Sequence, residues 1–132
     1  MNKTYKGACF CGQLKFEFDG PSLWCAHCHC TMCRQSHGAA FVTWVGVAED
    51  KFKLTGESTL NWFDSSENAR RGFCGQCGSS VFFTSTQWPG EIHIARAAIP
   101  GEIDRQPQVH VFWDSHVDWA SVDDKLPIKE IG

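Results

Sequence analysis

The eight cysteines of this 132-residue chain occur in short groups, and their spacing constrains the fold more than any other feature. Thiols this close in sequence form disulfides with difficulty, but they can bind one metal ion together. Cys9 and Cys11 make one pair, and Cys74 and Cys77 make another. Zinc prefers four sulfur or nitrogen ligands in a tetrahedron, often delivered by two short loops. These four cysteines, hereafter the four-thiol group, predict a closed structural zinc site.

A second group of cysteines has three members. Cys28, Cys30 and Cys33 lie within six residues, so one loop that runs into a helical turn can present all three sulfurs. Three protein ligands with one open position are typical of a catalytic zinc site. Cys25 could close the site as a fourth ligand, but a loop already carrying three sulfurs has little room for another. We therefore expect Cys25 in the core or behind the ligands, and an open zinc site at the three-thiol group.

The length of the chain predicts a single domain over residues 1–132. Six tryptophans and ten phenylalanines supply enough bulky apolar material for one core. No stretch approaches the roughly 20 apolar residues of a membrane helix, so no membrane partner is expected. The first residues lack the apolar segment of a signal peptide. We expect a cytoplasmic protein, where close cysteines indicate metal binding or catalysis before disulfides.

The charge of the chain argues against nucleic-acid binding. The formal net charge is −3 before any thiolate is counted. Proteins that bind nucleic acids concentrate positive charge on one surface. Arg70 and Arg71 form the one candidate basic patch, and two adjacent arginines are more often a solvated face. We expect no nucleic-acid partner.

Hydrophobic patterning predicts a β-rich fold. Leu14, Phe16 and Phe18 alternate with polar residues, which is typical of a half-buried strand over residues 13–18. The other predicted strands share short apolar runs bounded by turn residues: 41–45, 52–54, 60–63, 80–84, 91–95 and 109–113. One short helix is predicted over residues 31–36. The expected fold class is a small, mostly β, antiparallel domain stapled by zinc, with at most short helices.

The chemistry of three thiolates around zinc favours a thiol substrate. Such a zinc is a weaker Lewis acid than one held by histidines, and bound thiols are deprotonated. Proton transfer would need a neighbour, and His27, His29 and His37 lie close in sequence. His29 stands between two ligands and cannot point at the metal with both of them, so it is not expected to be a ligand.

Taken together, the cysteine motifs resemble the glutathione-dependent formaldehyde-activating (GFA) family. The resemblance covers nearly the whole chain and rests on residues 7–12, 28–34, 71–79, Gly38, His110 and Trp119. It implies a β-rich "tent" of sheets held by a structural zinc on Cys9, Cys11, Cys74 and Cys77. It also implies a catalytic zinc on Cys28, Cys30 and Cys33. Cys25 is not part of the family's ligand pattern.

The resemblance further implies a carbon–sulfur lyase. The family's named activity joins formaldehyde and glutathione to give S-(hydroxymethyl)glutathione, so the expected partners are a glutathione-like thiol and an aldehyde. His29 or His110 would carry the proton, and Arg34 would bind a substrate carboxylate, unless it only caps the helical turn. The alternative is a zinc-stabilised binding or chaperone-like module without catalysis. Such a module would need only the four-thiol group, which leaves the three-thiol group without a purpose.

Overall fold

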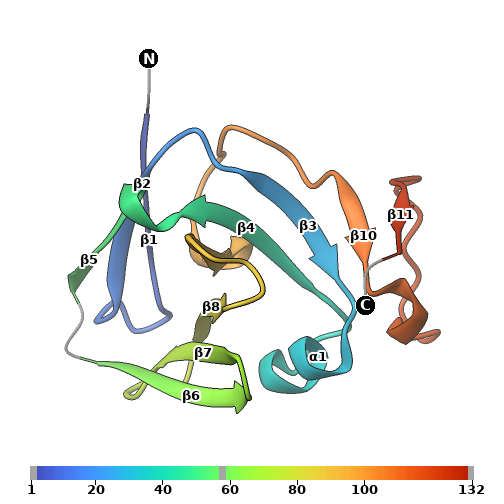
Figure 1. Cartoon of the computed structure of the whole chain (residues 1–132), viewed down its shortest axis with the longest axis horizontal. Coiled ribbons are helices and arrows are strands. Elements are labelled where there is room, and N and C mark those ends of the chain that lie inside the picture. The colour runs from blue at the N-terminus through green and yellow to red at the C-terminus, as the bar shows by residue number, and fades with distance from the viewer. Residues whose placement is uncertain (1–2, 57–58, 131–132) are drawn as a thin grey trace.

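The computed structural model describes residues 3–56 and 59–130, which form two sheets and one short α-helix (Figure 1). The three-stranded sheet has the order β1 (Thr4–Ala8), β2 (Lys15–Asp19), β5 (Phe52–Gly56). The eight-stranded sheet has the order β11 (Ile128–Lys129), β10 (Val109–Val111), β3 (Trp24–Cys28), β4 (Val42–Ala48), β9 (Glu91–Ala95), β8 (Ser80–Ser85), β7 (Ala69–Cys74), β6 (Leu60–Ser66).

The predicted fold class is confirmed. Neighbouring strands pair antiparallel, except that β10 runs parallel to both β3 and β11. Helical structure in the described residues is limited to α1 (Thr31–His37) and three 3₁₀ turns: Glu49–Lys51, Arg96–Ala98 and Trp113–Ser115. No helix in this part of the chain is long and apolar enough to cross a membrane.

The alternating pattern located β2 correctly. Leu14, Phe16 and Phe18 are each at most 1% exposed, as their spacing predicts. The predicted strands beginning at residues 41, 52, 60, 80 and 91 correspond to β4, β5, β6, β8 and β9. The prediction missed β1, β3, β7 and β11, of which β1, β3 and β7 lead directly into cysteine motifs.

The predicted strand over residues 109–113 is wrong at its end. Strand β10 stops at Val111, and a 3₁₀ turn begins at Trp113. Phe112 adopts a left-handed backbone conformation with φ 56°, which an extended strand cannot contain. The turn sends the chain back along β10, so that residues 124–129 lie beside it.

Aromatic packing joins the two sheets. Phe16 of β2 meets Phe82 of β8 edge to face, with ring centroids 5.2 Å apart. Phe52 of β5 contacts the same ring at 5.3 Å, and both Phe16 and Phe82 are 1% exposed. Burial of large rings is the strongest apolar contribution a core can receive. The core between the sheets therefore fixes the scaffold on which both cysteine groups are carried.

Helix α1 begins and ends with clear capping signals. Cys30 is its N-cap, and Cys33 N–H donates to Cys30 Sγ at 3.2 Å. Gly38 ends the helix in the left-handed conformation with φ 61°, where a residue without Cβ is favoured. The helix lies beside the end of β3 (Figure 1), so its first turn faces the last residue of that strand. This junction assembles the three-thiol group.

Candidate metal centres and active site

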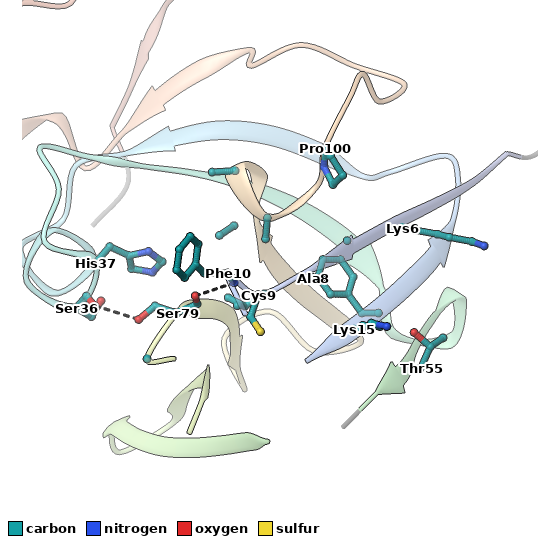
Figure 2. A pocket seen from close by; sticks show the side chains of 18 residues that line it. Lys6, Ala8, Cys9, Phe10, Lys15, Ser36, His37, Thr55, Ser79 and Pro100 are labelled. Carbon is teal, nitrogen blue, oxygen red and sulfur yellow. Dashed lines mark hydrogen bonds between the residues drawn. The ribbon is translucent and has the colours of Figure 1, made fainter. Parts of the chain in front are cut away.

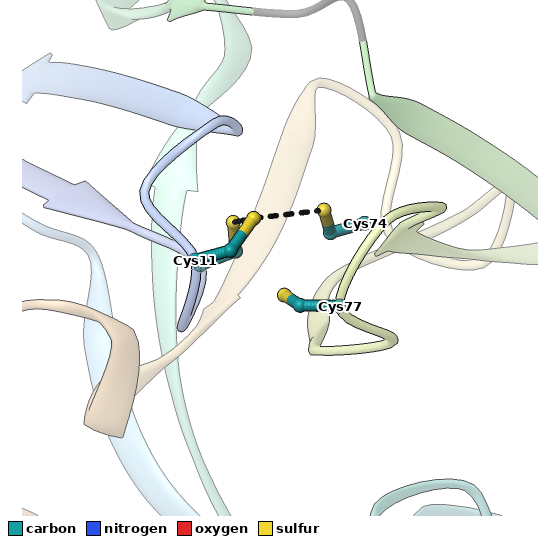
Figure 3. A group of neighbouring side chains, drawn as sticks. Cys11, Cys74 and Cys77 are labelled. Atoms are coloured by element: carbon teal, nitrogen blue, oxygen red, sulfur yellow. Dashed lines mark hydrogen bonds between the residues drawn. The ribbon is translucent and has the colours of Figure 1, made fainter.

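The four-thiol group is brought together from two distant turns. Cys9 and Cys11 follow β1, while Cys74 ends β7 and Cys77 lies in the turn after it (Figure 3). The Sγ atoms of Cys9 and Cys11 are 3.5 Å apart, and those of Cys11 and Cys74 are 3.7 Å apart. All four sulfurs lie within 4.8 Å of one another.

The two turns of the four-thiol group resemble each other. Gly12 and Gly78 follow the cysteine pairs with φ values of 82° and 80°, a conformation that favours glycine. In the second turn, Gly78 N–H donates to the Cys74 carbonyl at 2.8 Å. A bond from Phe10 N–H to Ser79 Oγ, 3.1 Å long, ties the first turn to the second. Each turn thus has a glycine in the left-handed conformation directly after its second cysteine.

The geometry of the four-thiol group fits a zinc ion. Zn–S bonds of about 2.3 Å in a tetrahedron place the sulfurs about 3.8 Å apart. The two Sγ–Sγ distances given above lie within a few tenths of an ångström of that value. Four sulfur donors without an oxygen donor are the ligand set of structural zinc sites.

The three-thiol group is local. Cys28 ends β3, Cys30 caps α1 and Cys33 lies in its first turn. The Cys28 and Cys33 sulfurs are 3.6 Å apart, and all three sulfurs lie within 4.8 Å of one another. Among residues 3–56 and 59–130, no further His, Cys, Asp or Glu completes this group. Its donors suit the same kind of metal as the four-thiol group, but with one ligand fewer.

The three-thiol group lies in apolar surroundings with one cation. Cys28 and Cys33 are buried in a cluster with Val42 and Trp44. The guanidinium of Arg71 donates to Cys33 Sγ from two nitrogens. Hydrogen bonds from its neighbouring thiols, and then the positive charge of Arg71, hold the pKa of Cys33 far below its ordinary value. Arg71 therefore places a positive charge directly against the Cys33 sulfur.

Cys25 lies outside both groups. Its side chain is fully buried with Val45 and Phe16 in the core between the sheets. On β3, Cys25 pairs with Val45 of β4 and Cys28 pairs with Val42, so the two thiols point to opposite faces. Burial raises the pKa of Cys25 to about 11, which describes a neutral thiol. The expectation of a core position for Cys25 is confirmed.

His29 and His110 meet in a hydrogen-bonded chain that ends at Asp124. His110 Nε2 donates to the Asp124 carboxylate at 3.0 Å, which leaves Nδ1 of His110 as an acceptor. His29 Nε2 therefore donates to that Nδ1 at 2.8 Å. Nδ1 of His29 is buried and has no partner in the described residues. Burial, then the neighbouring histidines, lowers the pKa of His29 to about 4, so the ring is neutral at pH 7.

The histidine chain lies across β3 from the three-thiol group. His27 pairs with Thr43 of β4, and its Nδ1 is 2.8 Å from Thr43 Oγ1. Successive residues of a strand point to opposite faces, so His27 and Cys28 are on different faces of the sheet. The His29 ring contacts Trp113 and His110 on the face of His27, with centroids 4.8 and 5.0 Å away. Asp124, which the sequence analysis missed, has no local motif that would have identified it.

Comparison with known proteins gives the family. Residues 4–115 match the family described as glutathione-dependent formaldehyde-activating enzyme. The chain belongs to the GFA family. An uncharacterized lyase of Schizosaccharomyces pombe is 31% identical over 84 residues, which are 62% of this chain and 58% of the yeast protein. The chain thus spans less than two thirds of that curated relative.

A solved structure shares the fold of this GFA protein. The crystal structure of a Rhodobacter sphaeroides protein, a structural genomics target, aligns with a TM-score of 0.64 at 20% identity. The alignment covers 94% of this chain and 99% of the other. This similarity concerns the fold alone.

Arg34 and His37 occupy the helix of the three-thiol group in this GFA protein. Arg34 Nη2 lies 3.4 Å from Thr31 Oγ1, and the guanidinium has no carboxylate partner among the described residues. The Arg34 carbonyl accepts the N–H groups that end the helix. The ring of His37 packs edge to face on Trp44, with centroids 5.2 Å apart. Burial, then the charge of Arg71, lowers the pKa of His37 to about 4.

A groove of about 880 Å³ runs between the first cysteine turn and helix α1 (Figure 2). Ser36 and His37 line its α1 end, and Lys6 and Lys15 line the end next to the three-stranded sheet. Phe10 stands in the groove wall with 93% of its surface exposed. Neither lysine forms an ion pair within the described residues. The groove thus combines an apolar wall with free positive charge.

Proposed function

We propose that this protein is a zinc-dependent carbon–sulfur lyase that acts on thiol–aldehyde adducts such as S-(hydroxymethyl)glutathione. The observation that carries the proposal is the difference between the two thiol groups. One has the four donors that zinc prefers, and the other has three donors and no fourth within the described residues. Membership of the GFA family supports glutathione and formaldehyde as the reactants.

Cys28, Cys30 and Cys33 would hold the catalytic zinc, and Cys9, Cys11, Cys74 and Cys77 the structural one. A zinc ion in the three-thiol group would stabilise the substrate sulfur as a thiolate at neutral pH. In the cleavage direction, the carbon–sulfur bond of the adduct breaks and its electron pair stays on sulfur. The adduct hydroxyl loses its proton as the carbonyl of formaldehyde forms. A proton returned to sulfur gives free thiol, and the reverse sequence gives synthesis.

Cations on helix α1 and along the groove beside it would orient the thiol. Glutathione carries two carboxylates, and charge-assisted hydrogen bonds are the strongest contacts available for them. Arg34 has a guanidinium without a carboxylate partner in the described residues. Lys6 and Lys15 offer two further charges along the groove. We assign the carboxylates of the substrate to Arg34 and to this lysine end.

The sequence analysis expects His29 or His110 to carry the proton; from their position we propose instead that both are positioning residues. Their rings lie across β3 from the sulfurs, and Asp124 fixes the tautomer of both. His29 joins Cys28 to Cys30 in the chain, so a fixed ring holds the loop that carries two ligands. The hydrogen-bonded chain would thereby keep Cys28 and Cys30 in place from the face of β3 opposite to their sulfurs.

The exchange of ¹³C-formaldehyde with glutathione, followed by NMR, tests the lyase directly. The zinc-loaded protein should raise the rate of adduct formation and breakdown in proportion to its concentration. Cys30→Ser should abolish the increase, because only two thiols remain in the three-thiol group. Cys25→Ala is the matched control, since it removes a thiol that belongs to neither group.

A rate that stays at the uncatalysed value would reject the lyase. If the same protein still holds metal at the four-thiol group, the binding or chaperone-like module becomes the better account. Metal content per chain, measured by mass spectrometry on the same sample, separates this outcome from a protein that has simply lost its zinc.

A further inference from the structure

Arg71 is a buried charge without a carboxylate. The residue is 7% exposed, and no ion pair to Asp or Glu is found for it in the described residues. A buried charge is costly unless an opposite charge or hydrogen bonds compensate it. Arg70, the next residue, points to the other face of β7, where its guanidinium lies 4.5 Å above the ring of Trp62. Adjacent arginines on one strand therefore have different surroundings.

The contacts of Arg71 lead to the three-thiol group. Nη1 and Nη2 both donate to Cys33 Sγ, at 3.7 and 3.6 Å, and Nη1 donates to Ser36 Oγ at 3.2 Å. The guanidinium carbon lies 4.9 Å from the centroid of Phe83, which closes its other side. Nε is buried and lacks an acceptor among the described residues. The polar contacts of this buried guanidinium in the described residues are therefore those to Cys33 and Ser36.

The charge of the three-thiol group explains why a cation is needed. Three thiolates around a divalent ion carry one net negative charge, and an added thiolate makes it two. The group is packed against Val42, Trp44 and Ala95, where charges interact more strongly than in water. No other Lys or Arg in the described part of the chain donates to its sulfurs.

We propose that Arg71 is the positioning residue that selects an anionic sulfur as the added ligand of the three-thiol group. The proposal rests on the lyase function given above and deepens it. Arg71 holds Cys33 through hydrogen bonds from both Nη1 and Nη2, and its positive charge offsets the negative charge that an incoming thiolate brings. A neutral ligand brings no such charge, so its binding does not depend on Arg71. Arg71 thus sets the substrate class to anionic thiols.

Titration of the Co²⁺-loaded full-length protein with glutathione and, separately, with imidazole tests this selection. Cobalt in a thiolate site absorbs in the visible range, and the difference spectrum on ligand addition reports only a group that has a free position. Arg71→Gln should weaken glutathione binding about 10- to 100-fold, the usual worth of a charged hydrogen bond. Imidazole binding should change less than about 3-fold. Arg70→Gln is the matched control and should change neither affinity.

Arg71→Lys provides a second measurement if the glutamine variant does not fold. Lysine keeps the positive charge but lacks the planar guanidinium with its two parallel donors. The affinity of Arg71→Lys for glutathione should therefore lie between the affinities of the wild type and of Arg71→Gln. Equal losses for glutathione and imidazole in either variant would overturn the proposal, because a purely structural role has that effect. Unchanged affinity for glutathione would overturn it as well. A wild-type protein that binds no added thiol would reject the open site and the lyase together, a result distinct from loss of selectivity alone.

Discussion

The contribution of the four-thiol group to stability can be tested by removing its two outer sulfurs with Cys11→Ser and Cys77→Ser together. Cys11 is exposed and Cys77 is partly exposed, while the buried Cys9 and Cys74 stay in place. The double variant therefore removes the metal cross-link without opening a cavity in the core. One thiol is left on each turn, which is too few for a structural zinc site.

The expected loss follows from the length of chain that the cross-link closes. Cys11 and Cys74 are 63 residues apart, and the chain-entropy relation gives about 4 kcal/mol for a loop of that length. Unfolding entropy of about 2.1 cal/mol/K per residue converts this into a fall in Tm of about 15 °C for the 132-residue chain. Cys28 and Cys33 are only 5 residues apart, so breaking the three-thiol group with Cys30→Ser should cost about 2 kcal/mol, or about 7 °C.

Thermal unfolding followed by circular dichroism measures both shifts, with metal content determined on the same samples. The double variant should lose one equivalent of metal, and its fall in Tm should be larger than that of Cys30→Ser. The reasoning is refuted if Cys30→Ser lowers Tm as much as the double variant does. It is refuted equally if the double variant loses its metal and Tm moves by less than about 5 °C.

Three further predictions concern single positions. Gly46→Ala should cost about 1–3 kcal/mol in urea unfolding, because a Cβ there would lie 2.3 Å from the ring of Trp24 and force it off Glu91. Cys25→Ala should lower the unfolding free energy by about 1 kcal/mol and leave the metal content unchanged, which mass spectrometry checks. His29 and His37 have folded pKa values of about 4, below the unfolded value, so stability should be retained above about pH 6.5 and fall from there toward pH 4. Each of the two histidines contributes a slope of up to about 1.4 kcal/mol per pH unit to the unfolding free energy, and His37→Gln should remove one such contribution from urea titrations across this range.

Strands with one buried face were predictable because alternation is a local property. Phe16 and Phe18 of β2 repeat every second residue, and both are 1% exposed. Strand β3 has no such alternation, because Cys25 and Ala26 are adjacent and both buried. Cys28 was assigned to a ligand loop, although it still belongs to the strand. The cysteines of β3 thus interrupt the alternation of apolar and polar residues by which a strand is predicted from sequence.

The grouping of the cysteines was predictable, whereas their surroundings were not. Short spacing alone brings Cys28, Cys30 and Cys33 within reach of one another, and the two short cysteine pairs indicated the two loops of the four-thiol group. Asp124 reaches His110 only because Phe112 reverses the chain, and neither residue signals this contact locally. Arg71 was considered as a surface charge because β7 was not predicted. Alternation along that strand places Arg70 outward and Arg71 inward.

Strand β7 connects the two thiol groups physically. Cys74 ends the strand as part of the four-thiol group, and Arg71, three positions earlier, donates to Cys33 of the three-thiol group. The strand is held on both sides by β6 and β8, so its register fixes both contacts at once. A structural zinc on Cys74 would then do more than close a long loop, because it would also set the depth at which Arg71 reaches Cys33. Under the proposed function, the four-thiol group would stabilise the scaffold, and the three-thiol group would take its balancing positive charge from Arg71 on that scaffold.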